Sequence, residues 1–316
     1  MDELVWGYPI VFHLFLVSLG AGVLAVSAYL VLWRSDDPAA FALARYGAFL
    51  APLPLLLDGL VLILDLGSFH AGYWFKFLNL YKIVTASPMS IGTWLITAFI
   101  IISLLYAHTF LRMPAGPDDP RVGRRRGLAW AGLAVALTVA AYPGFLLSGM
   151  QARPFWNSPL VPLVYFFSAL VLGIACKLLF LAWRTRSTPT TKDRGDGPGL
   201  TVWLARIGTY LSAGELLLVI LFVVFAHRGA GSVTQAVTVI MGGGVLATVF
   251  WFWAVAVGLV LPMLIMMVAA FRPPATLEGV LLKAVEIAAP LLLLFGAFML
   301  RYVFVVAGQI TGPVGL

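Results

Sequence analysis

Ionisable side chains interrupt the long apolar runs of this sequence at a few positions. A charged group inside a bilayer costs about 2.5–3.5 kcal/mol even on insertion scales, so such positions usually mark function. A tyrosine before a Pro-Gly pair joins them, and the set is His13, Asp58, Asp65, Tyr142, Glu215, Glu286 and Arg301. Histidine exchanges protons near neutral pH, tyrosine offers a directed hydroxyl, and a carboxylate can pass a proton on. Such groups suit a ligand with two carbonyls on an apolar ring, as in a quinone.

Four of the predicted helices place these groups in one outer layer. At about 1.5 Å per residue, His13, Tyr142 and Arg301 lie roughly 8–10 Å inward from the predicted outer helix ends, and Asp65 lies close to the surface. Asp58 precedes Asp65 by seven residues, so it shares a helix face two turns deeper. We therefore expect a quinone pocket in this layer, although His13 and Tyr142 also fit interfacial packing and an aromatic belt.

Deeper carboxyl groups extend this layer toward the other surface. Glu215 lies near the predicted midplane and Glu286 toward the opposite end, so with Asp58 and Arg301 they would form a discontinuous proton track. Structural roles stay open for each of them. Asp58 would pair with Arg301 or cap a backbone group, Glu215 would bond a neighbouring helix, and Glu286 would reach back to the surface.

The sequence has few residues that could bind a haem, an iron–sulfur cluster or a metal ion. The chain has one cysteine, Cys176, whereas a cluster needs several thiolates. Its histidines are His13, His70, His108 and His227, and only a site from His13 and His227 could hold a haem. We expect no haem, no cluster and no metal in this chain.

The elements that must position these residues are membrane-spanning helices. The sequence is 62% hydrophobic and 10% charged, against about 25% charged residues in soluble domains. A span needs about 20 apolar residues, and eight runs qualify: 9–32, 44–67, 90–111, 128–149, 159–183, 202–226, 244–271 and 279–308. We expect one all-α integral membrane domain over residues 1–316, built as two packed four-helix bundles. A short interfacial piece is expected at 233–241, before three glycines.

The basic residues predict the orientation. The loops after odd-numbered helices, with their flanks, hold fifteen of the twenty Lys and Arg residues. Basic loops stay in the cytoplasm, so both termini are predicted outside, and the net charge of +7 reflects topology and not nucleic-acid binding. Because the start, Met1-Asp2-Glu3, is acidic, we expect a permanent first helix and no cleaved signal peptide.

Short motifs in a fixed order carry a family resemblance. They are His13 with Leu19-Gly20-Ala21-Gly22, Asp65-Leu66-Gly67, Ser87-Pro88-Met89-Ser90-Ile91-Gly92, Tyr142-Pro143-Gly144, Arg153-Pro154-Phe155-Trp156-Asn157, Glu215, Gly258 to Pro262, Leu300-Arg301-Tyr302-Val303 and Ala307-Gly308-Gln309. Gly20 and Gly22 would let helices or a flat ring approach. Together the motifs resemble the NrfD/PsrC family of membrane subunits.

That resemblance implies a quinone pocket at the outer face, lined by His13, Asp58 or Asp65, Tyr142 and Gly144. Arg153 would steady the quinone or meet a partner, or anchor the interface with Trp156. The family has an asparagine three residues before its pocket histidine, where this chain has Ile10, so one quinone contact differs.

The resemblance also implies partners and a location. A periplasmic ferredoxin-like iron–sulfur subunit would exchange electrons with menaquinone or ubiquinone, and would connect to a molybdopterin or multihaem catalytic subunit. The chain would lie in a bacterial or archaeal cytoplasmic membrane and act only within that complex. The alternative function is an ion-coupled secondary transporter, which predicts inverted repeats and broken helices.

Overall fold

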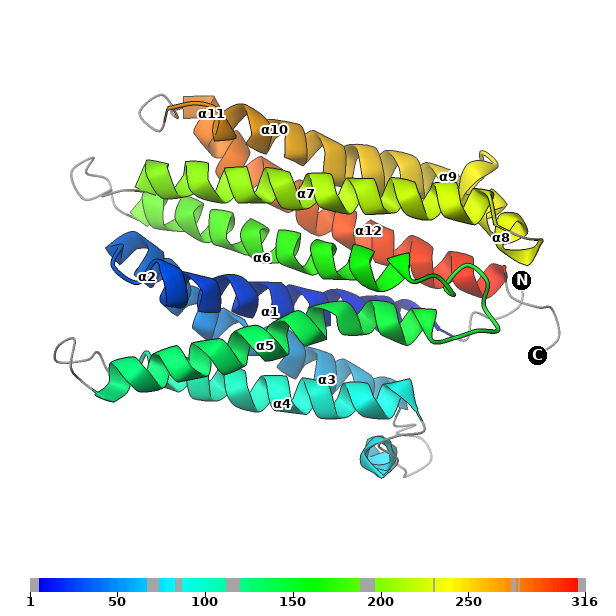
Figure 1. Ribbon diagram of the computed structural model, residues 1–316, viewed down its shortest axis with the longest axis horizontal. Coiled ribbons are helices and arrows are strands. Elements are labelled where there is room, and N and C mark those ends of the chain that lie inside the picture. Colours follow the sequence, from blue (N-terminus) through cyan, green and yellow to red (C-terminus); the bar gives the residue numbers. More distant parts are fainter. Residues whose placement is uncertain are drawn as a thin grey trace.

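The computed structural model describes residues 6–66, 74–82, 87–111, 120–187, 197–229, 231–273, 277 and 279–311, and these residues form helices and connections without a strand (Figure 1). Eight of the helices are long and apolar enough to cross a membrane, as the sequence predicted. They are α1 (Tyr8–Trp33), α2 with α3 (Pro38–Leu50, Pro52–Leu66), α4 (Pro88–His108), α5 (Pro120–Ser148), α6 (Leu160–Ser187), α7 (Gly197–His227), α9 to α10 (Val245–Thr248, Leu261–Ala270) and α11 to α12 (Gly279–Lys283, Ala289–Ile310).

Among the described residues, non-α helical turns occur in three segments. The seventh span contains a π-helical segment, η4 (Val249–Val260), and the eighth contains another, η6 (Ala284–Ala288). A 3-10 helix, η2 (Trp74–Tyr81), precedes α4, and α8 (Ser232–Met241) is the short helix expected before the three glycines. Turns of π-helix are rare in proteins, and those that occur are often found at functional sites. The residues around η4 are therefore candidates for a functional role.

The second and fourth spans begin at least six residues earlier than hydropathy predicted. The second begins at Pro38 and not at 44, because the Asp37 side chain accepts bonds from the backbone N–H groups of Ala39 and Ala40 and caps the helix. The fourth begins at Pro120 and not at 128, so α5 extends past its apolar stretch. Hydropathy marks the apolar part of a helix, whereas a polar cap such as Asp37 can start the helix outside that part.

Helix α1 is the centre of the molecule. It packs against α2, α3, α5, α6 and α12, and it is the most buried of the spans. Glycine permits its closest approach: a Cβ on Gly22 would lie 1.7 Å from the carbonyl oxygen of Ala169 on α6, and Gly173 faces the same point. The sequence-based interpretation of Gly22 as a contact between helices is confirmed.

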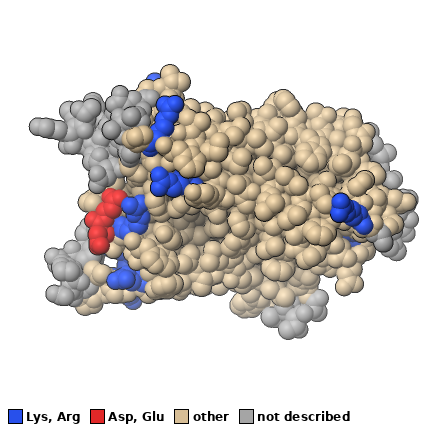
Figure 2. Space-filling model, turned by 45° about the horizontal axis from the view of Figure 1, so that its top comes forward, with Lys and Arg blue, Asp and Glu red and all other residues tan. Residues whose placement is uncertain are grey.

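The two ends of the bundle differ in charge. The backbone N–H of Trp6 donates to Gln309 Oε1 over 2.8 Å, so the start of α1 and the end of α12 lie together. Figure 2 shows most visible Lys and Arg side chains at the opposite end, where α2, α5 and α11 begin in Figure 1. The charge asymmetry in the sequence is therefore an asymmetry between two ends in space.

Candidate functional site

A histidine and an aspartate on neighbouring helices form a buried pair. His13 on α1 is 4% exposed and Asp58 on α3 is 0% exposed, and His13 Nδ1 lies 2.8 Å from Asp58 Oδ1. A carboxylate on one ring nitrogen holds the imidazole in place and leaves Nε2 to exchange a proton. The alternative pairing of Asp58 with Arg301 is wrong, because the carboxylate bonds the histidine.

The packing of α3 turns Asp58 toward α1. A Cβ on Gly20 would lie 2.2 Å from Leu55 Cδ1, so Leu55 faces α1 at a close approach. Asp58 follows Leu55 by three residues and therefore lies on the same face of α3. Asp65 belongs to the last described turn of that helix, but its side chain lies outside the described residues. Its role in the pocket stays a prediction.

Tyr142 lies beside this pair, on α5. Its ring stands edge-on to the His13 ring with centroids 6.5 Å apart, and the side chain is buried. Gly92 on α4 makes the space for it: a Cβ there would lie 1.9 Å from both the Tyr142 hydroxyl and its ring carbon Cζ. Helix α5 continues through Pro143 to Ser148. Three spans thus bring His13, Asp58 and Tyr142 together.

A groove between α4 and α5 reaches Tyr142 from the outside of the bundle. Its volume is about 480 Å³, and it is lined by Pro88, Ile91, Leu95, Thr138, Ala141, Tyr142, Phe145 and Leu146. Ile91 and Phe145 are 45% and 61% exposed, so this groove opens on the apolar side of the bundle. Ligand pockets commonly have volumes of about 300–1,000 Å³ and mostly apolar walls. Tyr142 is the lining residue that also contacts the His13 ring.

Arg301 occupies the other side of α1. Its Nε donates to the carbonyl of Leu14 over 3.2 Å, and its Nη1 donates to Ser168 Oγ over 3.1 Å. The guanidinium also lies 5.2 Å from the Tyr165 ring centroid. Because Leu14 follows His13, the two polar groups lie at a similar height, as the sequence predicted. They do not share one pocket, because α1 separates them.

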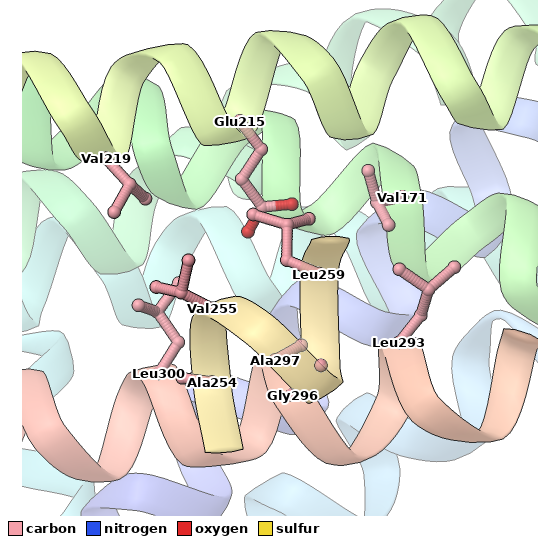
Figure 3. Close-up of a pocket in the computed structure, with 11 residues that line it drawn as sticks. Val171, Glu215, Val219, Ala254, Val255, Leu259, Leu293, Gly296, Ala297 and Leu300 are labelled. Atoms are coloured by element: carbon pink, nitrogen blue, oxygen red, sulfur yellow. The ribbon is translucent and has the colours of Figure 1, made fainter. Parts of the chain in front are cut away.

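Glu215 belongs to the Arg301 side. It is buried on α7, near enough to Ser168 and Arg301 to interact electrostatically. Figure 3 shows its carboxylate among apolar side chains of α6, η4 and α12. The cavity there measures about 10 Å³, which is room for about one water molecule. This site is too small for an aromatic ring.

Glu286 forms a third polar cluster. It is buried in η6, and the Thr201 hydroxyl of α7 donates to its Oε1 over 2.6 Å. The alternative in which Glu286 reaches out to the surface is therefore wrong. Among the described residues, the three carboxylates Asp58, Glu215 and Glu286 lie in separate clusters, so the predicted proton track is not a connected series of side-chain bonds.

Two predicted pocket residues lie in packing contacts. Arg153 Nη1 donates to the carbonyl of Gln309 over 2.7 Å, which ties the loop between α5 and α6 to the end of α12. Trp156 Nε1 donates to the carbonyl of Phe304 nearby, in keeping with the anchoring alternative. Gly144 faces α6, where a Cβ would lie 2.4 Å from Pro162 Cα. It allows α5 and α6 to approach and does not line the groove.

Sequence reasoning overlooked Lys177. This lysine is 0% exposed on α6, and its Nζ donates to the carbonyl of Leu43 over 3.2 Å. A Cβ on Gly47 would lie 1.6 Å from Nζ, so the glycine leaves the space that the amine fills. The signal was present, since Lys177 interrupts the predicted span 159–183. It was counted as a basic residue of the cytoplasmic side and not as a buried one.

The other histidines do not join His13 in a metal site among the described residues. His108 ends α4 and His227 ends α7, both exposed, whereas His13 is buried and bonded to Asp58. His70 lies outside the described residues. Within the described ranges, no group of three or more His, Cys, Asp or Glu side chains is arranged to hold a metal ion.

The family described as "Polysulphide reductase, NrfD" matches residues 1–313. The chain belongs to the NrfD family. It is 28% identical to Protein NrfD of Escherichia coli (strain K12), over 98% of this chain and 96% of that one. It is also 28% identical to a polysulfide reductase chain of Wolinella succinogenes, over 98% of this sequence and 95% of that one.

A more distant relative comes from Halobacterium salinarum. This protein, named as a putative dimethyl sulfoxide reductase membrane subunit, is 26% identical, over 67% of this sequence and 52% of its own. These relatives include proteins named as reductase chains or membrane subunits. They place the chain among membrane proteins of oxidoreductase complexes.

Proposed function

We propose that this NrfD-family chain is the quinone-reactive membrane subunit of a respiratory oxidoreductase complex. The observation that carries the proposal is the position of Tyr142, which lines an apolar groove of about 480 Å³ and also stands against the His13 ring. The groove supplies a slot for the quinone ring, and the His13–Asp58 pair behind Tyr142 supplies a place for its protons.

Substrate enters from the lipid, between α4 and α5. Ile91 and Phe145 line the mouth and Tyr142 lines the inner end, so an isoprenoid-bearing ring moves along apolar walls until an oxygen meets the phenol. Tyr142 and Thr138 supply the hydroxyl groups of an otherwise apolar lining. A slot with few polar groups orients a ring by its oxygens and accepts the rest through apolar contact.

The electrons and the protons of the substrate take different routes. When a quinol is oxidised, its two electrons pass to a docked redox partner, and its two protons leave one at a time through the Tyr142 hydroxyl toward His13 Nε2. Asp58 stabilises the imidazolium that forms, since its carboxylate lies 2.8 Å from Nδ1. His13 hands on the first proton before it accepts the second. Reduction of a quinone uses the same residues in reverse.

The partner proposed is a periplasmic ferredoxin-like iron–sulfur subunit, connected to a molybdopterin or multihaem catalytic subunit. Support comes from relatives named as parts of polysulfide and dimethyl sulfoxide reductases. We also propose two four-helix bundles that meet along α1 and α6, with both termini outside. The gathering of basic residues at the other end supports this orientation. The family match disfavours the transporter alternative.

A pair of tyrosine variants tests the proposal. Tyr142→Phe removes only the hydroxyl at the groove, and Tyr165→Phe removes one from an equally buried tyrosine near Arg301. We expect Tyr142→Phe to lower menadiol turnover of the purified complex by about 10²-fold, the lower range for lost acid–base catalysis. Tyr165→Phe should retain turnover, and both complexes should assemble.

Binding is measured separately from turnover. A fluorescent quinol-site inhibitor should be quenched on titration with the native complex, and His13→Ala should abolish that quenching while the complex keeps all its subunits. Equal losses of turnover in the two tyrosine variants, or unchanged quenching with His13→Ala, would remove the site from this groove.

A further inference from the structure

A second groove lies at the basic end of the same helix pair. Its volume is about 760 Å³, and it is lined by Leu105, His108, Thr109, Arg121, Arg124, Gly127 and Leu128. The first three come from the end of α4 and the residue after it, and the others come from the first turns of α5. This groove is separate from the Tyr142 groove, since the two have no lining residue in common.

Polar and apolar groups are sorted along this groove. Arg121, Arg124 and Leu128 follow each other at helical spacing on one face of α5, and Leu105 and His108 do the same on α4. The arginines lie in the first turns of α5 and His108 in the last turn of α4, whereas Leu105 and Leu128 lie further into the apolar part of the bundle. From the end of the bundle inward, the lining of the groove changes from cationic to apolar, as in a binding site for an amphiphilic molecule.

The inner wall of the groove is fixed by packing. Arg125, the buried neighbour of Arg124, donates from Nη2 to the carbonyl of Thr109 over 2.6 Å. Its guanidinium also lies 4.5 Å from the Phe110 ring centroid and 5.1 Å from that of Phe41. These contacts tie α5 to the end of α4. The groove thus has a wall that exists before any ligand arrives.

Gly127 leaves the groove open. A Cβ at this position would meet nothing within 4 Å, so the volume in front of it is free space. No close helix approach requires a glycine there. A larger residue would therefore enter the groove and not the protein interior.

We propose that this groove binds one anionic phospholipid. His108, Arg121 and Arg124 would hold the headgroup phosphate, for which arginine offers paired donors, and the acyl chains would lie along Leu105 and Leu128. Basic pockets between transmembrane helices on the cytoplasmic side bind such headgroups. Charge alone is the competing explanation, because basic residues at this end also set topology. The concave shape and its apolar continuation separate the two explanations.

Arg126 provides the matched control. It is exposed on the same helix, adjacent to Arg125, and does not line the groove. Arg126→Gln removes the same charge as Arg124→Gln from nearly the same height. If the groove binds lipid, only substitution of the lining arginines should weaken lipid binding. If diffuse charge attracts lipid, substitution of any of these arginines should weaken it equally.

The experiment titrates the purified full-length protein in detergent with tail-labelled phosphatidylglycerol. We expect saturable binding of one lipid, with phosphatidylcholine far weaker. The double variant Arg121→Gln/Arg124→Gln should weaken binding about 25-fold, from roughly fivefold for each cation near an anionic lipid. Arg126→Gln should bind as the native protein does. Gly127→Leu keeps every charge but fills the groove, and should also abolish saturable binding.

Three outcomes would overturn the proposal. If Arg126→Gln weakens binding as much as Arg124→Gln does, the lipid is attracted by diffuse charge. If Gly127→Leu binds the lipid as the native protein does, the groove is not the binding site. Competition by glycerol 3-phosphate at concentrations equal to the lipid would identify a site for free phosphate. Unchanged thermal midpoints of the variants confirm that each is folded.

Discussion

The substitution Gly92→Ala tests the geometry around Tyr142 most directly. The added Cβ would lie 1.9 Å from the Tyr142 hydroxyl and Cζ, so the ring must retreat by about 1.5 Å to reach 3.4 Å, where ordinary contact begins. A misplacement of about 1 Å near reacting groups costs on the order of 10²-fold in rate. We therefore expect quinol turnover to fall by about 10²-fold, with overpacking costing about 1–3 kcal/mol of stability.

The assay is menadiol oxidation by the purified complex, with assembly checked by the set of subunits that co-purify. Gly132→Ala is the matched control, because a Cβ there would meet no atom closer than 3.7 Å, and it should leave turnover unchanged. If Gly92→Ala acts only through Tyr142, adding it to Tyr142→Phe should lower turnover little further. Native turnover in Gly92→Ala, or a fully additive loss in the double variant, would refute the reasoning.

Three further predictions concern the other polar clusters. Asp58→Asn keeps the shape of the His13 partner but removes its charge, so turnover should fall by about 10²–10⁴-fold with inhibitor binding retained; normal turnover would exclude the pair as proton acceptor. Glu215→Gln should lower the proton-to-electron ratio in proteoliposomes if protons cross the membrane through this group, and an unchanged ratio would end that hypothesis. Arg301→Met removes the guanidinium bonds to the Leu14 carbonyl, the Ser168 hydroxyl and the Ala297 carbonyl, so unfolding should require about 1–3 kcal/mol less; an unchanged thermal midpoint would contradict this.

The division of polar groups on the two sides of α1 has a functional consequence. His13 and Asp58 lie among α1, α3 and α5, beside the groove, whereas Arg301, Ser168 and Glu215 lie among α6, α7 and α12. Arg301 contacts α1 at the Leu14 carbonyl, one residue from His13, and at the Phe15 ring. Quinone chemistry and any long-range proton movement would therefore use different halves of the molecule.

The sequence determined the architecture at the level of spans. Because a bilayer cannot satisfy backbone polar groups, each long apolar run must be a helix, and the eight runs became the eight candidate spans. Depth was also readable, since a helix advances by a fixed rise: His13 and Arg301 do lie at one height. Ends were less certain where Asp37 capped a helix outside its apolar run.

Only the tertiary structure decided which polar groups meet. Adjacent positions on a helix point about 100° apart, so His13 and Leu14 face different neighbours, and the sequence does not say which. The rotation of α1 is set by packing, through Gly20 against α3 and Gly22 against α6. That rotation points His13 toward Asp58 and leaves Arg301 on the opposite side of α1. The sequence alone could not give these partners, because they depend on contacts between helices that are remote in sequence.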